Sequence, residues 1–457
     1  MSSTEDPAFA LAAHVTRTGF EALPAATVAA TKRDILDTFG CVLGGSGAPG
    51  IDALFELADE WGGREESIVV LRGRRLPAPQ AALLNASMGH ALDFDDTHDT
   101  AGSIHPGISV LAAGLAVADM IGAVDGRRFV RAIALGLDVS CRIALASTVD
   151  RGWHRTACIG VFGAAVASGL LLGLDAEQMR HALGIAYSHA AGNRQCILDG
   201  ALTKRSQAGQ AASAGVFSAF LARKAFTGAH NIFAGKYGFL ALYQPDGADV
   251  ALLTRDLGSA FRGDGLSFKP YPCGRPLHGG IDAALAAHAE IGSARVEAVT
   301  MSMDKAGYAD QFESGPAKRR PTQVVEAQFA LPFLVATALV HGKVGIGEVA
   351  GLGDAATLAL SDRIVGEVVS GDKPRGWVTL TARLSDGRLI RIESTDPIGS
   401  PEKPLGAELL RAKFRDNAAN ARRPIATANV NAALTALERL EELDDVATLT
   451  RMFAGGD

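Results

Sequence analysis

The stretch Asn85–Gly107, NASMGHALDFDDTHDTAGSIHPG, is the densest group of ionisable side chains in the chain. Its histidines and aspartates are His90, His98, His105, Asp93, Asp95, Asp96 and Asp99. Residues 77–92 are predicted to form a helix, because Pro77 suits a first helical turn and small apolar residues share one face. That helix would carry the aspartates at its C-terminal end, where the helix dipole disfavours negative charge. A conflict between side-chain charge and the helix dipole is typical of functional sites. His105 would lie on the following loop, where catalytic residues are often placed.

Three interpretations of this cluster are open on the residues alone. The first is a polar helix and loop whose aspartates cap backbone groups, as Asp commonly does. The second is a divalent metal site, since Asp and His are good ligands, although the DFDDTH spacing matches no tight metal signature. The third, which we favour, is a metal-free acid–base site in which a carboxylate orients a histidine that moves a proton.

The composition is that of an ordinary globular protein of two or three domains: 457 residues, 48% hydrophobic and 21% charged. A net charge of −6 gives no indication of nucleic-acid binding. The five cysteines are scattered without a CxxC pair, which favours a reducing compartment over a disulfide framework. The N-terminus lacks a basic-then-apolar signal, so a cytoplasmic protein is expected.

Ala157–Leu174 is an uncharged run close to membrane-spanning length. It is rich in Gly and Ala rather than in large aliphatic residues, and no second such run accompanies it. We interpret it as a fully buried core helix and expect no membrane partner.

The predicted fold class is mainly α, with a large all-helical domain and a smaller α+β lid domain. Apolar spacing predicts helices over 8–18, 25–43, 51–61, 77–92, 107–122, 126–148, 156–173, 176–190, 204–224 and 234–243. After residue 265, helices are predicted at 276–291 and 324–340 and a strand at 295–303. Alternation around Asp386-Gly387 predicts a β-hairpin over 377–393. The helical domain would comprise 1–265 with 405–457 and be discontinuous, and the lid would comprise 266–400.

Three more places carry side chains suited to catalysis or binding. His154 precedes the buried helix, where a histidine is as often a cap or a packed surface group. Lys204 and Arg205 open a helix, and with free backbone N–H groups they would make a carboxylate or phosphate site; the alternative is a solvated basic turn. Lys269 lies in a proline-stiffened loop, KPYPCGRPLH, with Tyr271, Arg275 and His278 close behind. The alternative for that loop is a surface loop whose cations face solvent.

Acid–base groups in one region and cations in others are what proton abstraction next to a carboxylate requires. Such a C–H bond is weakly acidic, so a base must take the proton. Cations must then hold the charge that develops on the carboxylate oxygens.

Four motifs together resemble the MmgE/PrpD family: HALDFDDTHDTAGSIHPG, GWHRTACIGVFGAA, LTKR…AGQAASAG…KAFTG and KPYPCGRPLHGGIDA. The family contains 2-methylcitrate dehydratase, cis-aconitate decarboxylase and iminodisuccinate epimerase, and the resemblance covers about residues 8–445. It implies an all-helical domain, an α+β lid, a homodimer, and no metal or organic cofactor. It also implies a small di- or tricarboxylate as substrate.

By this resemblance, the cleft between the domains would hold the catalytic candidates Asp93, His105, His154, Lys204 and Lys269, with Thr97 binding a carboxylate. His105 or His154 would move the proton and Asp93 would orient a histidine, while Lys204 and Lys269 bind substrate carboxylates. Tyr271 and Arg275 are further substrate-binding candidates by position.

Two departures from the family pattern stand out. Family decarboxylases carry a histidine five residues after the loop lysine, where this chain has Gly274, which speaks against decarboxylation. The family also often has a histidine where this chain has Gln207.

The expected activity is therefore a lyase of the hydratase/dehydratase type, with an epimerase as the alternative and a decarboxylase after that. A non-catalytic ligand-binding member and a metal-dependent hydrolase are the alternatives from other classes.

Overall fold

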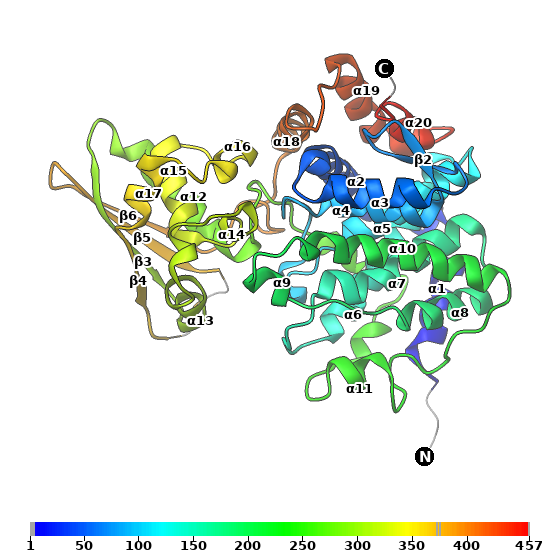
Figure 1. Ribbon diagram of the computed structural model, residues 1–457. Coiled ribbons are helices and arrows are strands. Elements are labelled where there is room, and N and C mark those ends of the chain that lie inside the picture. The colour runs from blue at the N-terminus through cyan, green and yellow to red at the C-terminus, as the bar shows by residue number, and fades with distance from the viewer. Residues whose placement is uncertain (1–4, 372, 374–375, 456–457) are drawn as a thin grey trace.

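The protein is described by a computed structural model covering residues 5–371, 373 and 376–455. It is mainly helical with a small α+β part, which confirms the predicted fold class. Figure 1 shows the α+β part on the left, made of β3–β6 and α12–α17, and the helical part on the right. The last helices, α18–α20, lie with the helical part, where α18 and α19 contact α2 and α20 contacts α5.

The helical part begins with eleven helices and a small hairpin. The helices are α1 Pro7–Arg17, α2 Ala25–Gly44, α3 Ile51–Trp61, α4 Ala78–Gly89, α5 Pro106–Ile121, α6 Gly126–Ala146, α7 Arg155–Leu172, α8 Ala176–Tyr187, α9 Gln195–Leu198, α10 Thr203–Arg223 and α11 Phe239–Tyr243. The hairpin pairs β1 Ser67–Val69 with β2 Arg74–Leu76. The chain returns to this part with α18 Ala407–Ala419, α19 Thr427–Glu438 and α20 Ala447–Arg451.

Helix α7 is the centre of the helical part and packs against α5, α6 and α10. Its glycines permit close approach: a Cβ on Gly163 would lie 2.6 Å from the carbonyl oxygen of Gly136 in α6. Helix α7 is the one described helix that is long and apolar enough to cross a membrane, and 94% of that segment is buried inside the fold. It is thus the buried core helix that its sequence predicted.

The α+β part contains a four-stranded sheet in the order β4-β3-β5-β6. Its strands are β3 Val296–Met303, β4 Ile364–Val368, β5 Val378–Leu384 and β6 Leu389–Ser394. Strands β5 and β6 form the hairpin predicted around Asp386-Gly387, where Gly387 adopts a φ of +88°. The helices of this part are α12 His278–Ile291, α13 Lys305–Tyr308, α14 Val324–Ala327, α15 Leu331–His341, α16 Ile346–Ala350 and α17 Ala355–Ser361.

Three predicted helices differ from those in the structure. The helix predicted over 77–92 ends at Gly89, so the aspartates lie in the loop beyond it. The helix predicted over 234–243 forms only at Phe239–Tyr243. The helix predicted over 324–340 is two helices separated at 328–330, because Pro332 begins a new helix rather than continuing the first.

Two clusters of buried hydrophobic residues fill the two parts. One combines residues between Ala8 and Phe268 with residues between Leu405 and Phe453, and the other lies between Tyr271 and Ile390. We propose these clusters as the cores of two domains, the first of them discontinuous in sequence.

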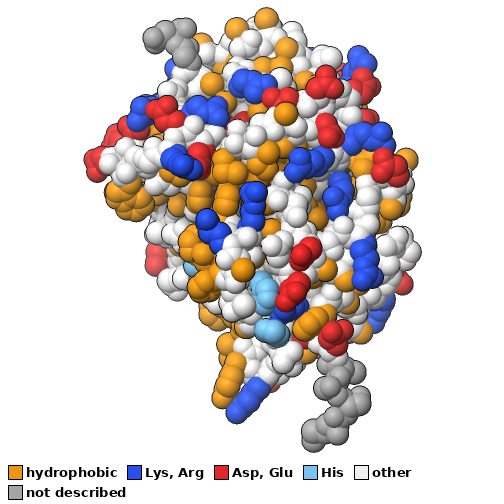
Figure 2. Space-filling view, turned by 90° about the vertical axis from the view of Figure 1, so that its right-hand side faces the viewer, with side chains coloured by type: hydrophobic (Ala, Val, Ile, Leu, Met, Phe, Trp, Pro, Cys, Tyr) orange, Lys and Arg blue, Asp and Glu red, His pale blue; other side chains and the backbone are white. Residues whose placement is uncertain are grey.

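The surface offers apolar area for a partner. Figure 2 shows hydrophobic side chains gathered near the middle of one face, with Lys and Arg side chains beside them. Trp61 and Phe217 are also exposed, on α3 and α10. The homodimer that the resemblance implies stays a prediction, which a mass measurement in solution decides.

Candidate active site

Three buried charges meet where the two parts of the molecule join. Asp93 lies in the loop after α4, Lys204 in the first turn of α10, and Lys269 in the loop before α12. Lys204 donates to Asp93 Oδ1, and Lys269 Nζ lies 2.8 Å from both Asp93 Oδ2 and the Asp93 carbonyl oxygen. Asp93 adopts a φ of +51°, a left-handed conformation that Asp tolerates better than most residues.

The two lysines determine the charge state of Asp93. Burial alone would raise the pKa of its carboxyl, but Lys204 and Lys269 outweigh burial and hold the pKa well below its usual value. Asp93 is therefore ionised, and the cluster carries one excess positive charge when both lysines are protonated. That charge suits it to a carboxylate ligand.

Three histidines lie beside this cluster. Asp95 contacts two of them, the role predicted for Asp93, whose carboxylate binds the two lysines instead. His90 Nδ1 lies 2.7 Å from Asp95 Oδ2, and His105 Nδ1 lies 3.6 Å from Asp95 Oδ1. His90 Nε2 lies 3.4 Å from Nε2 of His154, which precedes α7. Lys204 and Lys269 are near enough to affect the pKa of His90, so the histidines and the charge cluster form one site.

Burial keeps the three imidazoles neutral. It lowers the pKa of His90 and His105 well below the usual value and is the main cause that lowers the pKa of His154 to about 3. Neutral imidazoles accept protons, so the site contains bases next to a cationic carboxylate-binding cluster.

Gln207 determines which ring nitrogen of His154 carries the proton. Its Oε1 accepts from the backbone N–H of Asn193 at 3.0 Å, and its Nε2 donates to the carbonyl of Asn193 at 3.1 Å. The same Oε1 lies 3.0 Å from His154 Nδ1, so that nitrogen must donate. The residue that replaces a frequent family histidine thus positions a catalytic candidate.

A metal could be held only by His90, Asp95 and His105, whose donor atoms form the one such group among the described residues. The contact of 2.7 Å between His90 and Asp95 is that of a hydrogen bond. It is shorter than the roughly 3.3 Å between two ligands of a tetrahedral zinc ion with bonds of 2.0–2.1 Å. The arrangement fits an Asp–His hydrogen bond better than a metal site.

The substrate-binding candidates divide into two groups. Thr97 is buried beside the aspartate loop, its backbone pairs with Ser267, and its hydroxyl has no hydrogen-bond partner among the described residues, so it is available for a ligand. The side chain of Tyr271 instead donates to Asp282, and that of Arg275 binds Asp99. Tyr271 and Arg275 are therefore engaged with other residues in this structure.

The break between α14 and α15 places a residue at the site that sequence reasoning missed. Lys204 Nζ lies 5.8 Å from the centre of the Phe329 ring. A Cβ on Gly274 would lie 2.9 Å from the same ring, so Phe329 occupies the space beside that glycine. Pro332 was the available signal, since it predicts a helix boundary before it.

A second group of buried carboxylates lies behind Asp95, and sequence reasoning noticed only Asp96 among its members. Asp34, Asp37 and Asp96 are buried, and both Asp34 and Asp96 lie within 3 Å of the position of a Cβ on Gly107. Lys413 of α18 reaches into this group, 2.6 Å from Asp37. Burial and the neighbouring carboxylates raise the pKa of Asp34 and Asp96 well above the usual value.

Replacing Asp34 with Asn is expected to reduce the loss of stability at high pH. Because the pKa of Asp34 is raised in the folded state, the native protein holds a proton that the unfolded chain has lost above its ordinary pKa of 3.8. The free energy of unfolding should therefore fall as the pH rises through this range, and Asn, which stays neutral, should remove that contribution. Urea unfolding from pH 5 to 9 measures it. Asp59→Asn, at an exposed ion pair with Arg74, is the control, and parallel curves for Asp34→Asn and wild type would contradict the prediction.

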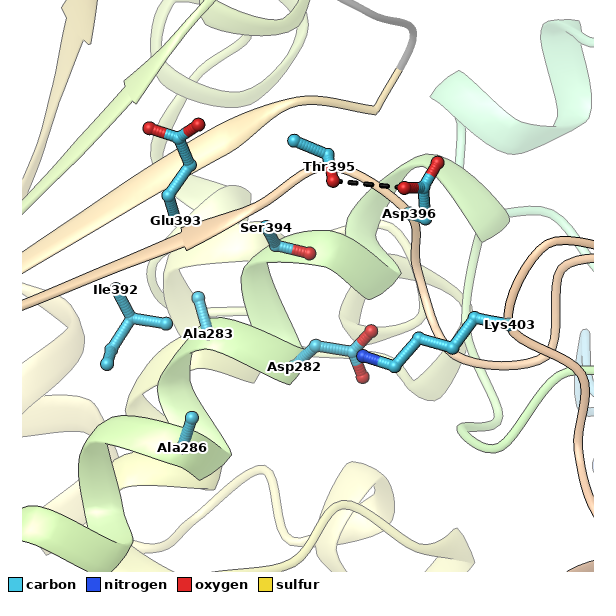
Figure 3. A pocket seen from close by; sticks show the side chains of 9 residues that line it. All are labelled: Asp282, Ala283, Ala286, Ile392, Glu393, Ser394, Thr395, Asp396 and Lys403. Atoms are coloured by element: carbon cyan, nitrogen blue, oxygen red, sulfur yellow. Dashed lines mark hydrogen bonds between the residues drawn. The ribbon is translucent and has the colours of Figure 1, made fainter.

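The structure has two hollows outside this site. One of about 320 Å³, shown in Figure 3, is lined by Asp282, Lys403 and residues at the end of β6, and it contains none of the site residues. The other, of about 200 Å³, is lined by residues of both parts, including Leu92, Pro272 and Gln328. Leu92 precedes Asp93 in the chain, but Asp93, Lys204 and Lys269 do not line this hollow.

Comparison with known proteins shows similarity over almost the whole chain. Residues 10–250 match the MmgE/PrpD N-terminal domain and residues 271–437 match the MmgE/PrpD C-terminal domain. Cis-aconitate decarboxylase of Mus musculus is 27% identical, covering 93% of this chain and 88% of the relative. The cis-aconitate decarboxylase-like protein oryM of Aspergillus oryzae is 26% identical over 95% of this chain and 94% of the relative, and the Homo sapiens decarboxylase is 24% identical over 98% and 94%. The two domain matches together show that this chain belongs to the MmgE/PrpD family.

Proposed function

We propose that the protein is a metal-free lyase of the hydratase/dehydratase type, acting on a small di- or tricarboxylate such as 2-methylcitrate. The observation that carries this proposal is the buried Lys204–Asp93–Lys269 cluster beside three neutral histidines. The cluster supplies positive charge for a carboxylate and the histidines supply a base. These are the two requirements for removing a proton from the adjacent carbon.

The reaction would proceed in two stages. A histidine takes the proton from the carbon next to a carboxylate, and the electron pair of the C–H bond spreads onto carboxylate oxygens held by Lys204 and Lys269. The β-hydroxyl then leaves with a proton as water, and a double bond forms. The buried site strengthens the attraction between the lysines and the developing charge, because little water screens it.

Decarboxylation is the second candidate, since the similar proteins named above are cis-aconitate decarboxylases. Gly274 weighs against it, because family decarboxylases carry a histidine at this position, and here the Phe329 ring lies 2.9 Å from where a Cβ would be. Epimerisation shares the first stage and differs only in reprotonation on the opposite face.

Proton NMR in D2O with a panel of carboxylates tests the proposal. The panel contains citrate, 2-methylcitrate, cis-aconitate, iminodisuccinate, hydroxysuccinate and aminosuccinate, each with and without a chelator. We expect deuterium to enter a carbon next to a carboxylate, with alkene formation, in both conditions. Loss of CO2 would assign a decarboxylase, an inverted centre an epimerase, and inactivation by the chelator a metal enzyme. No exchange with any compound would reject this class of substrate.

A further inference from the structure

The Nε2 atoms of His90 and His154 face each other. Each side chain is already oriented by a partner: His90 Nδ1 by Asp95 at 2.7 Å, and His154 Nδ1 by Gln207 at 3.0 Å. Asp95 as a carboxylate only accepts, and Gln207 Oε1 only accepts, so both Nδ1 atoms carry the proton. In the neutral tautomers both Nε2 atoms are therefore unprotonated.

These two unprotonated nitrogens point at each other over 3.4 Å. Two facing lone pairs repel, and a proton placed between them replaces that repulsion by a hydrogen bond. The rings are nearly parallel, with an interplanar angle of 24°, and both side chains are buried, so neither turns freely to avoid the contact. The geometry suits the uptake of one proton by both imidazoles together.

From this geometry we propose that His90 and His154 act as one proton-binding unit, which takes up a single proton between the two Nε2 atoms while Asp95 balances its charge. In turnover, the unit holds the proton removed from the substrate until that proton leaves with the hydroxyl. This role in turnover rests on the proposed function, whereas the proton sharing itself does not. The C–H bond breaks as an N–H bond forms on the histidine that takes the proton. Transfer to the unit breaks that N–H bond and forms another on His90 or His154, which breaks in turn as the C–O bond breaks and an O–H bond of water forms. No proton is gained or lost over the cycle.

The surrounding charges limit the His90–His154 unit to one proton. Lys204, Lys269 and Arg205 disfavour a cation at His90, whereas Asp93 favours one. A positive charge on His90 lowers the pKa of His154, so a second proton is refused. Asp95 provides the closest counter-charge, and it contacts His90 more closely than His105, at 2.7 Å against 3.6 Å. A proton in the site is therefore better stabilised on His90 and His154 than on His105.

The sharing of the proton is tested in the ligand-free protein, by long-range 15N NMR of histidine-labelled protein during a pH titration. Single His→Gln or His→Asn variants assign the signals of the 11 histidines. We expect the Nε2 signals of His90 and His154 to shift together with one midpoint and to account for one proton in total. Separate midpoints, uptake by one residue alone, or no uptake down to acid unfolding would overturn the proposal. Because no substrate is needed, these results are independent of the proposed activity.

A variant separates proton sharing from a structural role. In His90→Asn the amide nitrogen replaces Nδ1 and can still donate to Asp95, while nothing replaces Nε2. We expect His154 to titrate alone and at lower pH, the acid limb of the kcat/KM profile to move to lower pH, and kcat to fall by about tenfold or more. His98→Gln, on the aspartate loop outside this pair, is the control and should leave the titration unchanged. An unaltered pH profile in a folded His90→Asn protein would reject the role in turnover.

Discussion

Replacing Asp93 with Asn is expected to lower the free energy of unfolding by about 3–5 kcal/mol, the usual cost of removing one partner of a buried ion pair. Asp93 neutralises part of the charge of Lys204 and Lys269, all three groups being buried. Asn is close in shape and also tolerates the φ of +51°, so the change removes charge with little backbone strain. Urea denaturation at neutral pH measures the loss.

The control for this change is Asp59→Asn, which removes a carboxylate from an exposed pair with Arg74 and should cost about 1 kcal/mol or less. A dicarboxylate ligand should raise the melting temperature of Asp93→Asn more than that of the wild type, because the ligand supplies the missing negative charge. Equal stability losses in the two variants would show that Asp93 is not the counter-charge of the lysines.

Replacing His105 with Gln is expected to reduce kcat/KM by about 10²–10⁴-fold, the usual contribution of a general acid–base group. Its Nδ1 has no hydrogen-bond partner among the described residues, whereas Nδ1 of His154 is held by Gln207 and its Nε2 faces His90. His105 is therefore the histidine best placed to take a proton directly from a ligand. Deuterium exchange into the substrate should fall in parallel with turnover.

His154→Gln is the informative comparison, and we expect a smaller loss from it. His98→Gln, a change on the same loop as His105, is the control and should retain activity. Full activity in both His105→Gln and His154→Gln would reject acid–base catalysis by these residues.

Sequence reasoning located most of the site because its residues occur in short motifs. Asp93, His105, His154 and Lys269 lie in segments between helices, and Lys204 lies in the first turn of one. The structure brings these five residues together. That they act catalytically stays a prediction, which the variants above test.

Residues that depend on packing between distant segments were missed. Lys413 is the buried cation of the carboxylate group behind Asp95, yet it lies in an ordinary amphipathic helix far along the chain. Phe329 was assigned to a helix interior because its neighbours have helical spacing, and the break at Pro332 places it by Lys204 instead. His90 was noticed in sequence, but its facing partner His154 lies 64 residues away, beyond the reach of motif spacing.

The contact of Lys269 with Asp93 has a consequence for how a ligand enters. Lys269 lies just before the hydrophobic cluster of the α+β part, and it is fully buried against a loop of the helical part. A carboxylate that arrives must compete with Asp93 for the same ammonium groups, so binding is an exchange of one counter-ion for another. Association should then be slower than encounter by diffusion and should be set by the rate at which this internal pair separates.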